Sequence, residues 1–383
     1  MPGGTPHERE NTRLSIDLMR GGFALMVMLA HGIEVTLARF GSDSNPGAGH
    51  GTLLKLLVAT LGRGAFWVGG FFILSGLCIQ WSVLAGLRKR EGFLTSYFIA
   101  RATRIYPLYL VAILIYVTIH VGIQAIGSPF EEPFSTAKLV SHIFMLQGVT
   151  GVIRPLGPAW SLTYECFYYL IWPLLLIAAA YRSNRALILG AFGCVMSAVT
   201  VGAVWKLSYH GSPDSVLVPV AMILFGFTTW AAGAWLATNW DSVARQISTR
   251  MACLATAGVA GAYLFQAWLQ TRNAHQWVFL AAGVGSLPFW VAMLSGTRLW
   301  AIPRRLTGLA HFAGLLSYPL YLLHRLFIET FDRIVPVAKE GFLSQPFGYF
   351  TASFVAVLLA CIAVGVPLEV AILRWRRGML RAG

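Results

Sequence analysis

Residues 17–38 read DLMRGGFALMVMLAHGIEVTLA and form the first long apolar segment of the chain. It is long enough to cross a bilayer, because a helix of about 20 apolar residues spans the hydrocarbon core. Arg20, His31 and Glu34 interrupt it, and it is longer than the apolar region of a typical signal peptide, so we expect it to be retained. A spanning helix with ionisable side chains predicts a membrane protein with a polar interior.

The rest of the chain has the same character. Of its 383 residues, 57% are hydrophobic and 11% are charged, whereas roughly 25% are charged in a soluble domain. This composition excludes a soluble globular protein and a disordered chain. The five cysteines lie in apolar sequence without metal-ligand spacing, so we expect buried thiols and no metal site.

Ten stretches of the chain are apolar enough to span a membrane. Backbone groups must pair with one another in lipid, and runs of this length do so as helices. We therefore predict an all-α, polytopic membrane helical bundle of about ten transmembrane helices, forming a single domain over residues 1–383. The predicted spans are 17–38, 65–84, 105–123, 159–180, 186–205, 216–237, 251–269, 277–296, 312–331 and 348–373.

The basic residues predict the orientation of the bundle. The net charge is +14, and in a membrane protein an excess of Lys and Arg marks the cytoplasmic side rather than a nucleic-acid partner. With ten spans, both termini lie in the cytoplasm, as a short segment over residues 1–16 and a basic tail over 374–383. The cytoplasmic set is then Arg9, Arg13, Arg20, Arg88, Lys89, Arg90, Arg101, Arg104, Arg182, Arg185, Arg245, Arg250, Arg298, Arg304, Arg305, Arg374, Arg376, Arg377 and Arg381.

Ionisable residues inside the spans are the candidates for function, because they are costly at membrane depth. Arg20 and His31 are eleven residues apart, which places them on one helix face about 16 Å apart along the axis. Asp17 can pair with Arg20 on the same stripe. A phosphate-bearing donor held by Arg20 could extend an arm toward His31. The alternative is that Arg20 extends to the membrane surface and His31 only packs.

Two later spans place further polar groups in the outer half of the membrane. Ser161 and Glu165 share a helix face, and Glu165 needs a partner, for which His31 is a candidate. Ser317, Tyr321 and His324 share another face. A second intramembrane histidine favours acid–base chemistry or substrate binding, since imidazole titrates near neutral pH. Each group could instead only tie helices together.

Three further segments bear on packing or on binding, and two of them have alternative interpretations. Gly62, Gly64, Gly69, Gly70 and Gly76 with Ser75 favour close helix packing. Arg101 and Arg104 end a cytoplasmic loop, where they fit either a phosphate site or the positive-inside rule. The segment 124–158 either folds back over the bundle or forms an irregular surface loop.

In these motifs, the chain resembles acyltransferase family 3, a family of integral membrane O-acyltransferases. The resemblance rests on five motifs in the family's order, on top of the ten-span topology. They are Ile16-Asp17-Leu18-Met19-Arg20 with His31; Phe71-Phe72-Ile73-Leu74-Ser75-Gly76; Arg101 and Arg104 with Tyr106-Pro107; Trp160-Ser161-Leu162 with Glu165, Phe167-Tyr168 and Pro173; and Ser317-Tyr318 with Tyr321-Leu322 and His324.

The resemblance implies transfer of an acyl group, mostly acetyl from cytoplasmic acetyl-CoA, to a hydroxyl of a cell-envelope glycan or a secondary metabolite. It implies a bacterial cytoplasmic (inner) membrane and a form without an appended extracytoplasmic domain. His31 resembles the catalytic histidine, as general base or as acylated nucleophile, with Glu165 and His324 assisting. Arg20, Arg101 and Arg104 are the implied acyl-CoA contacts. The candidate substrate contacts are Asp17, Ser75, Trp160, Ser161, Tyr168 and Tyr318.

A transporter or glycan flippase is the main alternative, because it also uses intramembrane His and Glu. Such a protein is expected to show an internal repeat, and residues 1–190 and 191–383 show no matching symmetry. An inactive scaffold is the third possibility, and the costly polar groups in five motifs argue against it.

Overall fold

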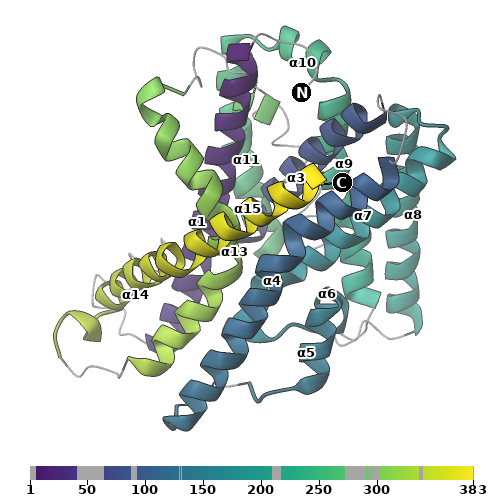
Figure 1. The fold of residues 1–383 in the computed structure, drawn as a ribbon. Helices are drawn as coiled ribbons and strands as arrows, with labels where there is room; N and C mark the ends of the chain where they lie inside the picture. Colours follow the sequence, from purple (N-terminus) through teal and green to yellow (C-terminus); the bar gives the residue numbers. More distant parts are fainter. Residues whose placement is uncertain are drawn as a thin grey trace. The chain divides into compact units, whose positions relative to one another are not determined.

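The computed structural model describes residues 6–40, 64–87, 93–128, 130, 132–208, 217–271, 290–291, 293–294, 302–335 and 340–382. Every regular element in these ranges is helical, which confirms the predicted all-α class for them (Figure 1). The elements are α1 (Pro6–Phe40), α3 (Gly64–Leu87), α4 (Phe93–Ala125), α5 (Thr136–Ile143), α6 (Gln147–Thr150), η1 (Arg154–Ala159), α7 (Trp160–Ala178), α8 (Ser183–Ser208), α9 (Leu217–Thr238), α10 (Trp240–Gln246), α11 (Thr249–Thr271), η3 (Arg304–Leu306), α13 (Thr307–Ile334), η4 (Phe342–Ser344), α14 (Pro346–Ala360), η5 (Cys361–Gly365) and α15 (Val366–Ala382).

Eight helical segments in the described ranges are long and apolar enough to cross a membrane. They coincide with eight of the ten predicted spans. The predicted span 251–269 is helix α11, which is not among the eight. The span 277–296 lies outside the described residues apart from 290–291 and 293–294, and so does the basic run 88–90. The total of ten spans and the cytoplasmic side of the termini stay predictions.

Several helices are longer than their apolar cores. Helix α1 begins at Pro6, within the segment expected to precede the first span, and α15 continues through the basic tail. The prediction that Arg101 and Arg104 end a loop is wrong, because both lie inside α4. Residues 93–104 contain no Gly or Pro, and a helix pairs its own backbone groups outside lipid as well as inside it.

The chain forms two compact units, which we describe separately. Unit 1 comprises Met1–Met19, Val68–Ala102 and Ser161–His311. Unit 2 comprises Arg20–Trp67, Thr103–Trp160 and Phe312–Gly383. The long helices α1, α4 and α13 each contribute residues to both units.

In unit 1, two glycines allow helices α3 and α9 to touch backbone to backbone. A Cβ atom at Gly76 would overlap the carbonyl oxygen of Trp230, and one at Gly233 would overlap that of Ile73. Small residues permit this approach in membranes, where no hydrophobic effect drives helices together. The packing role predicted for the glycine-rich segment is confirmed at Gly76.

In unit 2, α1 and α13 are joined by three polar side-chain pairs. Residue numbers rise together along the two helices, so the helices run parallel. This interface places both intramembrane histidines of the sequence motifs side by side. The pairs are His31 with His324, Glu34 with Arg325, and Arg39 with Asp332.

The segment between α4 and α7 also belongs to unit 2, where it forms α5, α6 and η1 and packs against α4 and α13. The hydroxyl of Tyr109 on α4 donates to the carbonyl oxygen of His142 at 2.9 Å. The hydroxyl of Tyr321 on α13 donates to that of Pro158 at 2.8 Å. Of the two arrangements considered for residues 124–158, folding back is therefore confirmed.

His142 holds this segment together as a buried, neutral imidazole. Its Nδ1 donates to the carbonyl oxygen of Lys138 at 2.8 Å, and its Nε2 accepts the backbone N–H of Ile153 at 3.3 Å. Burial lowers the pKa of His142 below its ordinary value, although the Lys138 carbonyl and Glu132 act in the opposite direction. Protonation would remove the acceptor for Ile153.

We expect Gly76→Ala to destabilise the protein by about 1–3 kcal/mol, because the added methyl group must push α3 away from α9. The thermal midpoint of the purified protein in detergent measures this loss. Gly193→Ala in α8 is the matched control, since a Cβ atom there meets nothing within 4 Å. Equal midpoints for the two variants would contradict the close packing.

We expect the amide of Ile153 to exchange with deuterium faster as the pH falls below about 6.5, after correction for intrinsic rates. A histidine whose pKa is lowered by folding contributes stability that is complete above its ordinary pKa. That contribution is lost as the pH falls toward the pKa of the folded state. His142→Gln, which cannot titrate, should remove the pH dependence of exchange across residues 138–153.

Candidate active site

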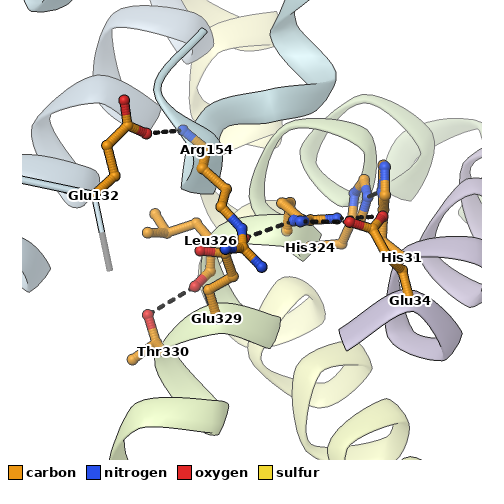
Figure 2. Close-up of polar contacts among 9 residues, drawn as sticks. His31, Glu34, Glu132, Arg154, His324, Leu326, Glu329 and Thr330 are labelled. Carbon is orange, nitrogen blue, oxygen red and sulfur yellow. Dashed lines mark hydrogen bonds and ion pairs between the residues drawn. The ribbon is translucent and has the colours of Figure 1, made fainter. Parts of the chain in front are cut away.

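His31 and His324 form a hydrogen-bonded pair in unit 2. The Nδ1 atom of His31 lies 2.8 Å from Nε2 of His324. Figure 2 marks this hydrogen bond between the two labelled side chains. His324 is fully buried, whereas His31 is only partly buried. The pair therefore joins a fully buried histidine to one that is partly exposed as a residue.

The hydrogen bonds of the pair determine where its protons lie. Nδ1 of His324 is 2.7 Å from the carbonyl oxygen of Leu320, and a carbonyl can only accept. In the neutral pair, His324 therefore carries its proton on Nδ1, and its Nε2 accepts the Nδ1–H of His31. This leaves the lone pair of His31 on Nε2. The buried histidine fixes the tautomer in which the partly exposed histidine can act as a base or a nucleophile.

A chain of alternating charges continues from the histidine pair. Arg325, next to His324 in sequence, donates to both carboxylate oxygens of Glu34 at 2.8 and 3.0 Å. Its Nε also donates to Glu329 at 2.8 Å, and Nε of Arg154 donates to the same oxygen at 3.1 Å. Glu132 accepts the backbone N–H of Arg154 at 2.8 Å (Figure 2). We call Glu34, Arg325, Glu329 and Arg154 the charge ladder.

Burial differs along the charge ladder. The side chains of Arg325 and Glu329 are 6% and 9% exposed, whereas those of Glu34 and Arg154 are 56% and 39% exposed. The ladder contains two cations and two carboxylates, so it carries no net charge as a whole. The buried members need this pairing, because an unpaired charge is strongly unfavourable in a protein interior.

Arg104 in unit 2 already has a buried carboxylate partner. Its Nη1 lies 2.5 Å from Oε1 of Glu369, whose side chain is 2% exposed. The guanidinium also lies 5.0 Å from the ring centre of Tyr318, and the Tyr318 hydroxyl donates to the carbonyl of Ile105. The structure thus brings together the predicted residues Arg104 and Tyr318, and it adds Glu369, which neutralises the arginine.

Arg101 in unit 1 makes neutral contacts. Its Nη2 donates to the hydroxyl of Ser82 at 2.8 Å, and its guanidinium lies 5.5 Å from the ring centre of Tyr97. Its Nε is buried and has no hydrogen-bond partner among the described residues. An unsatisfied N–H on a cation fits an anionic ligand.

The other candidates in unit 1 lie on α3 and α7. The Ser75 hydroxyl is 3.2 Å from the hydroxyl of Tyr169, a residue for which we had predicted no role. Tyr168 is fully buried, and its hydroxyl donates to the carbonyl of Ile223. Ser161 is buried and Glu165 is partly buried. Their predicted roles stay predictions.

The three remaining candidates, Arg20, Asp17 and Trp160, lie on helices α1 and α7. Because α1 is continuous from Pro6 to Phe40, Arg20 and His31 keep the common face predicted for them. The carboxylate of Asp17 lies 3.4 Å from Nδ1 of His311. Trp160 is the first residue of α7.

The sequence interpretation gave no role to most of the charge ladder or to Glu369. Glu34, Arg325 and Glu329 all lie in or beside predicted spans, so the rule that marks ionisable residues at membrane depth could have found them. Glu369 is likewise a single carboxylate in an apolar stretch. The rule does not identify the partners of Glu34, Arg154 and Glu369, because these partners are far away in sequence, whereas Arg325 and Glu329 are four residues apart.

A family model described as an acyltransferase domain matches residues 13–366, nearly the whole chain. The chain belongs to acyltransferase family 3. None of the curated proteins and none of the solved structures compared with it gives a match. Its apolar helices and its family together identify an integral membrane acyltransferase, which confirms the resemblance read from the five motifs.

We expect Glu369→Ala in this acyltransferase to lower the free energy of unfolding by about 3 kcal/mol, because it leaves Arg104 largely buried without its partner. Urea denaturation in detergent measures the loss. Combining Glu369→Ala with Arg104→Leu should restore most of the stability, since the unpaired charge is then absent. No recovery in the double variant would show that Glu369 stabilises the fold by packing alone.

Proposed function

We propose that this acyltransferase moves an acyl group, typically acetyl, from cytoplasmic acyl-CoA to a hydroxyl of a carbohydrate or related acceptor in a bacterial cytoplasmic membrane. The observation that carries the proposal is the hydrogen bond between His31 and His324 at 2.8 Å, with His324 bound in turn to Leu320. It provides a basic nitrogen on a partly buried ring, which acyl transfer to a hydroxyl requires.

In the proposed reaction, Nε2 of His31 removes the proton from the acceptor hydroxyl. The oxygen attacks the thioester carbonyl, the C–O bond forms, and the C–S bond breaks. The departing thiolate takes the proton from His31, so the imidazole returns to its starting state. His324 holds Nδ1–H of His31 throughout, as a carboxylate does in a catalytic triad. In the variant route, Nε2 of His31 attacks the thioester and the C–S bond breaks, releasing the thiolate. The acceptor oxygen then displaces the imidazole from the acyl group, and the hydroxyl proton passes to the thiolate.

The acyl-CoA donor is proposed to bind through cations. Arg101 fits its phosphates best, because it makes neutral contacts and has a buried Nε–H without a partner among the described residues. Arg20 is proposed to guide the pantetheine arm, since the rise of about 16 Å between Arg20 and His31 is on the order of that arm's length. Arg104 is a weaker phosphate contact than the sequence suggests, because Glu369 balances its charge.

The acceptor is proposed to approach the partly exposed edge of His31. Glu165 is kept as a candidate that orients an imidazole. The candidate substrate contacts Asp17, Ser75, Trp160, Ser161, Tyr168 and Tyr318 also stay as proposed. Among them, Tyr168 is the least suited, because its hydroxyl is buried and already bound to a carbonyl oxygen.

We expect His31→Ala to reduce transfer at least 1000-fold, because it removes the base, and His324→Ala to reduce it about 100-fold, because the tautomer is no longer fixed. The assay follows radiolabel from acetyl-CoA into a membrane extract of the source organism. His120→Gln on α4 is the control for loss of a buried histidine. Normal transfer by well-folded His31→Ala protein would overturn the proposal.

We expect Arg101→Gln to raise the KM for acetyl-CoA about tenfold or more, since charged hydrogen bonds contribute about 1.5–3 kcal/mol. Acetyl-3′-dephospho-CoA identifies the group that is bound. If Arg101 contacts the 3′-phosphate, wild-type protein and Arg101→Gln should use this analogue equally well. An unchanged KM for acetyl-CoA would remove Arg101 from the donor site.

A further inference from the structure

The charge ladder meets the histidine pair at Arg325. This residue follows His324 on α13, and both oxygens of its partner Glu34 are bound to it. Glu34 is three residues after His31 on α1, less than one helical turn away. The Arg325–Glu34 fork therefore joins the two helices at nearly the level at which the histidines meet. Glu329, one turn further along α13, holds the guanidinium from the other side.

Among the described residues of unit 2, the charged side chains near the histidine pair are the members of the charge ladder. On α1 and α13 the nearby charged side chains are Glu34, Arg325 and Glu329. From η1, Arg154 donates to Glu329. Tyr321, whose ring lies 6.4 Å from that of His324, uses its hydroxyl to bind Pro158. Helix α14, which brings Phe350 against Gly32, contains no charged residue.

We propose that Arg325 is a positioning residue of the histidine pair: clamped between Glu34 and Glu329, it aligns His31 with His324 and supplies a fixed positive charge beside them. This inference rests on the proposed acyl transfer through His31. A fixed cation near an imidazole disfavours the protonated ring, which has no lone pair to use. The bidentate ion pair between Arg325 and Glu34 also prevents α1 from sliding along α13. Such sliding would separate the two imidazole rings.

The chain contains a matched control for this role. Arg39 and Asp332 also join α1 to α13, with Nη1 of Arg39 2.7 Å from the carboxylate. Each is eight residues beyond its histidine, which is about 12 Å along the helix. This second ion pair fastens the same two helices without placing its charge beside the imidazoles. A merely structural role for Arg325 would make the two arginines equivalent.

The test compares the pH dependence of kcat/KM between pH 5.5 and 8.5 for wild-type protein, Arg325→Met and Arg39→Met. In this profile, kcat/KM falls on the acidic side as His31 becomes protonated, and we call that part the acid limb. We expect Arg325→Met to move the acid limb to higher pH by about one unit and to lower the maximal kcat/KM at least tenfold. Arg39→Met should lower the thermal midpoint while keeping the wild-type profile. Arg325→Lys should keep the acid limb near its wild-type position, because the positive charge remains. Its kcat/KM should still be lower than that of the wild type, since lysine cannot form the bidentate ion pair with Glu34.

Glu34→Gln tests the inference through a shift of the acid limb in the opposite direction. It removes a mostly exposed carboxylate and leaves Arg325 held by Glu329, so we expect the protein to fold. The acid limb should then move downward, because the positive charge is less compensated. If Arg325→Met does not fold, this variant alone decides. Wild-type acid limbs in Glu34→Gln and in any folded Arg325→Met would overturn the inference.

Failure of the underlying reaction is recognised separately. If His31→Ala still transfers acetyl groups, the proposed function is wrong whatever the Arg325 variants do. If His31→Ala is inactive and the Arg325 and Glu34 variants keep the wild-type profile, only the positioning role is wrong. Nitrogen-15 NMR of ring-labelled histidine provides a readout without turnover, and the His31 titration should move in the same directions as the acid limbs.

Discussion

The contact between α1 and α13 is the constraint on which the candidate site depends. In unit 2, three polar pairs join these helices, and an unpaired charge or imidazole is unfavourable in a protein interior. Each pair fixes the same relative position of the helices, so none can shift alone. The hydrogen bond between His31 and His324 is thus part of a larger fit, and its geometry is imposed by neighbours that take no direct part in chemistry.

The site illustrates how a membrane enzyme can combine many charges with a neutral interior. In unit 2, Arg325 is balanced by Glu34 and Glu329, Arg154 shares Glu329, and Arg104 is balanced by Glu369. These cations are therefore poor anchors for an anionic donor. In unit 1, Arg101 makes neutral contacts, and its buried Nε–H has no partner within the part of the chain that the structure describes. Charge balance separates arginines of similar sequence context into two groups.

The sequence predicted what depends on local spacing. Runs of apolar residues indicated helices, and the eleven-residue interval placed Arg20 and His31 on one face, because helical geometry is regular. It could not predict which helices meet, since His31 and His324 are separated by most of the chain. Glu165 was a reasonable partner for His31 by depth alone. The sequence also did not predict where helices begin and end. Arg101 lies inside α4, because a helix can extend beyond its apolar segment.

The parallel course of α1 and α13 also restricts how the chain passes through the bilayer. Two spans that point the same way must be separated by an odd number of crossings. Five candidate spans lie between them, namely α3, α4, α7, α8 and α9. Any further spans between α1 and α13 must therefore come in pairs. With one more crossing over α14 to α15, the total is even: eight and ten satisfy this parity, and nine does not. An even total agrees with the prediction that the start of α1 and the end of α15 lie on the same side of the membrane.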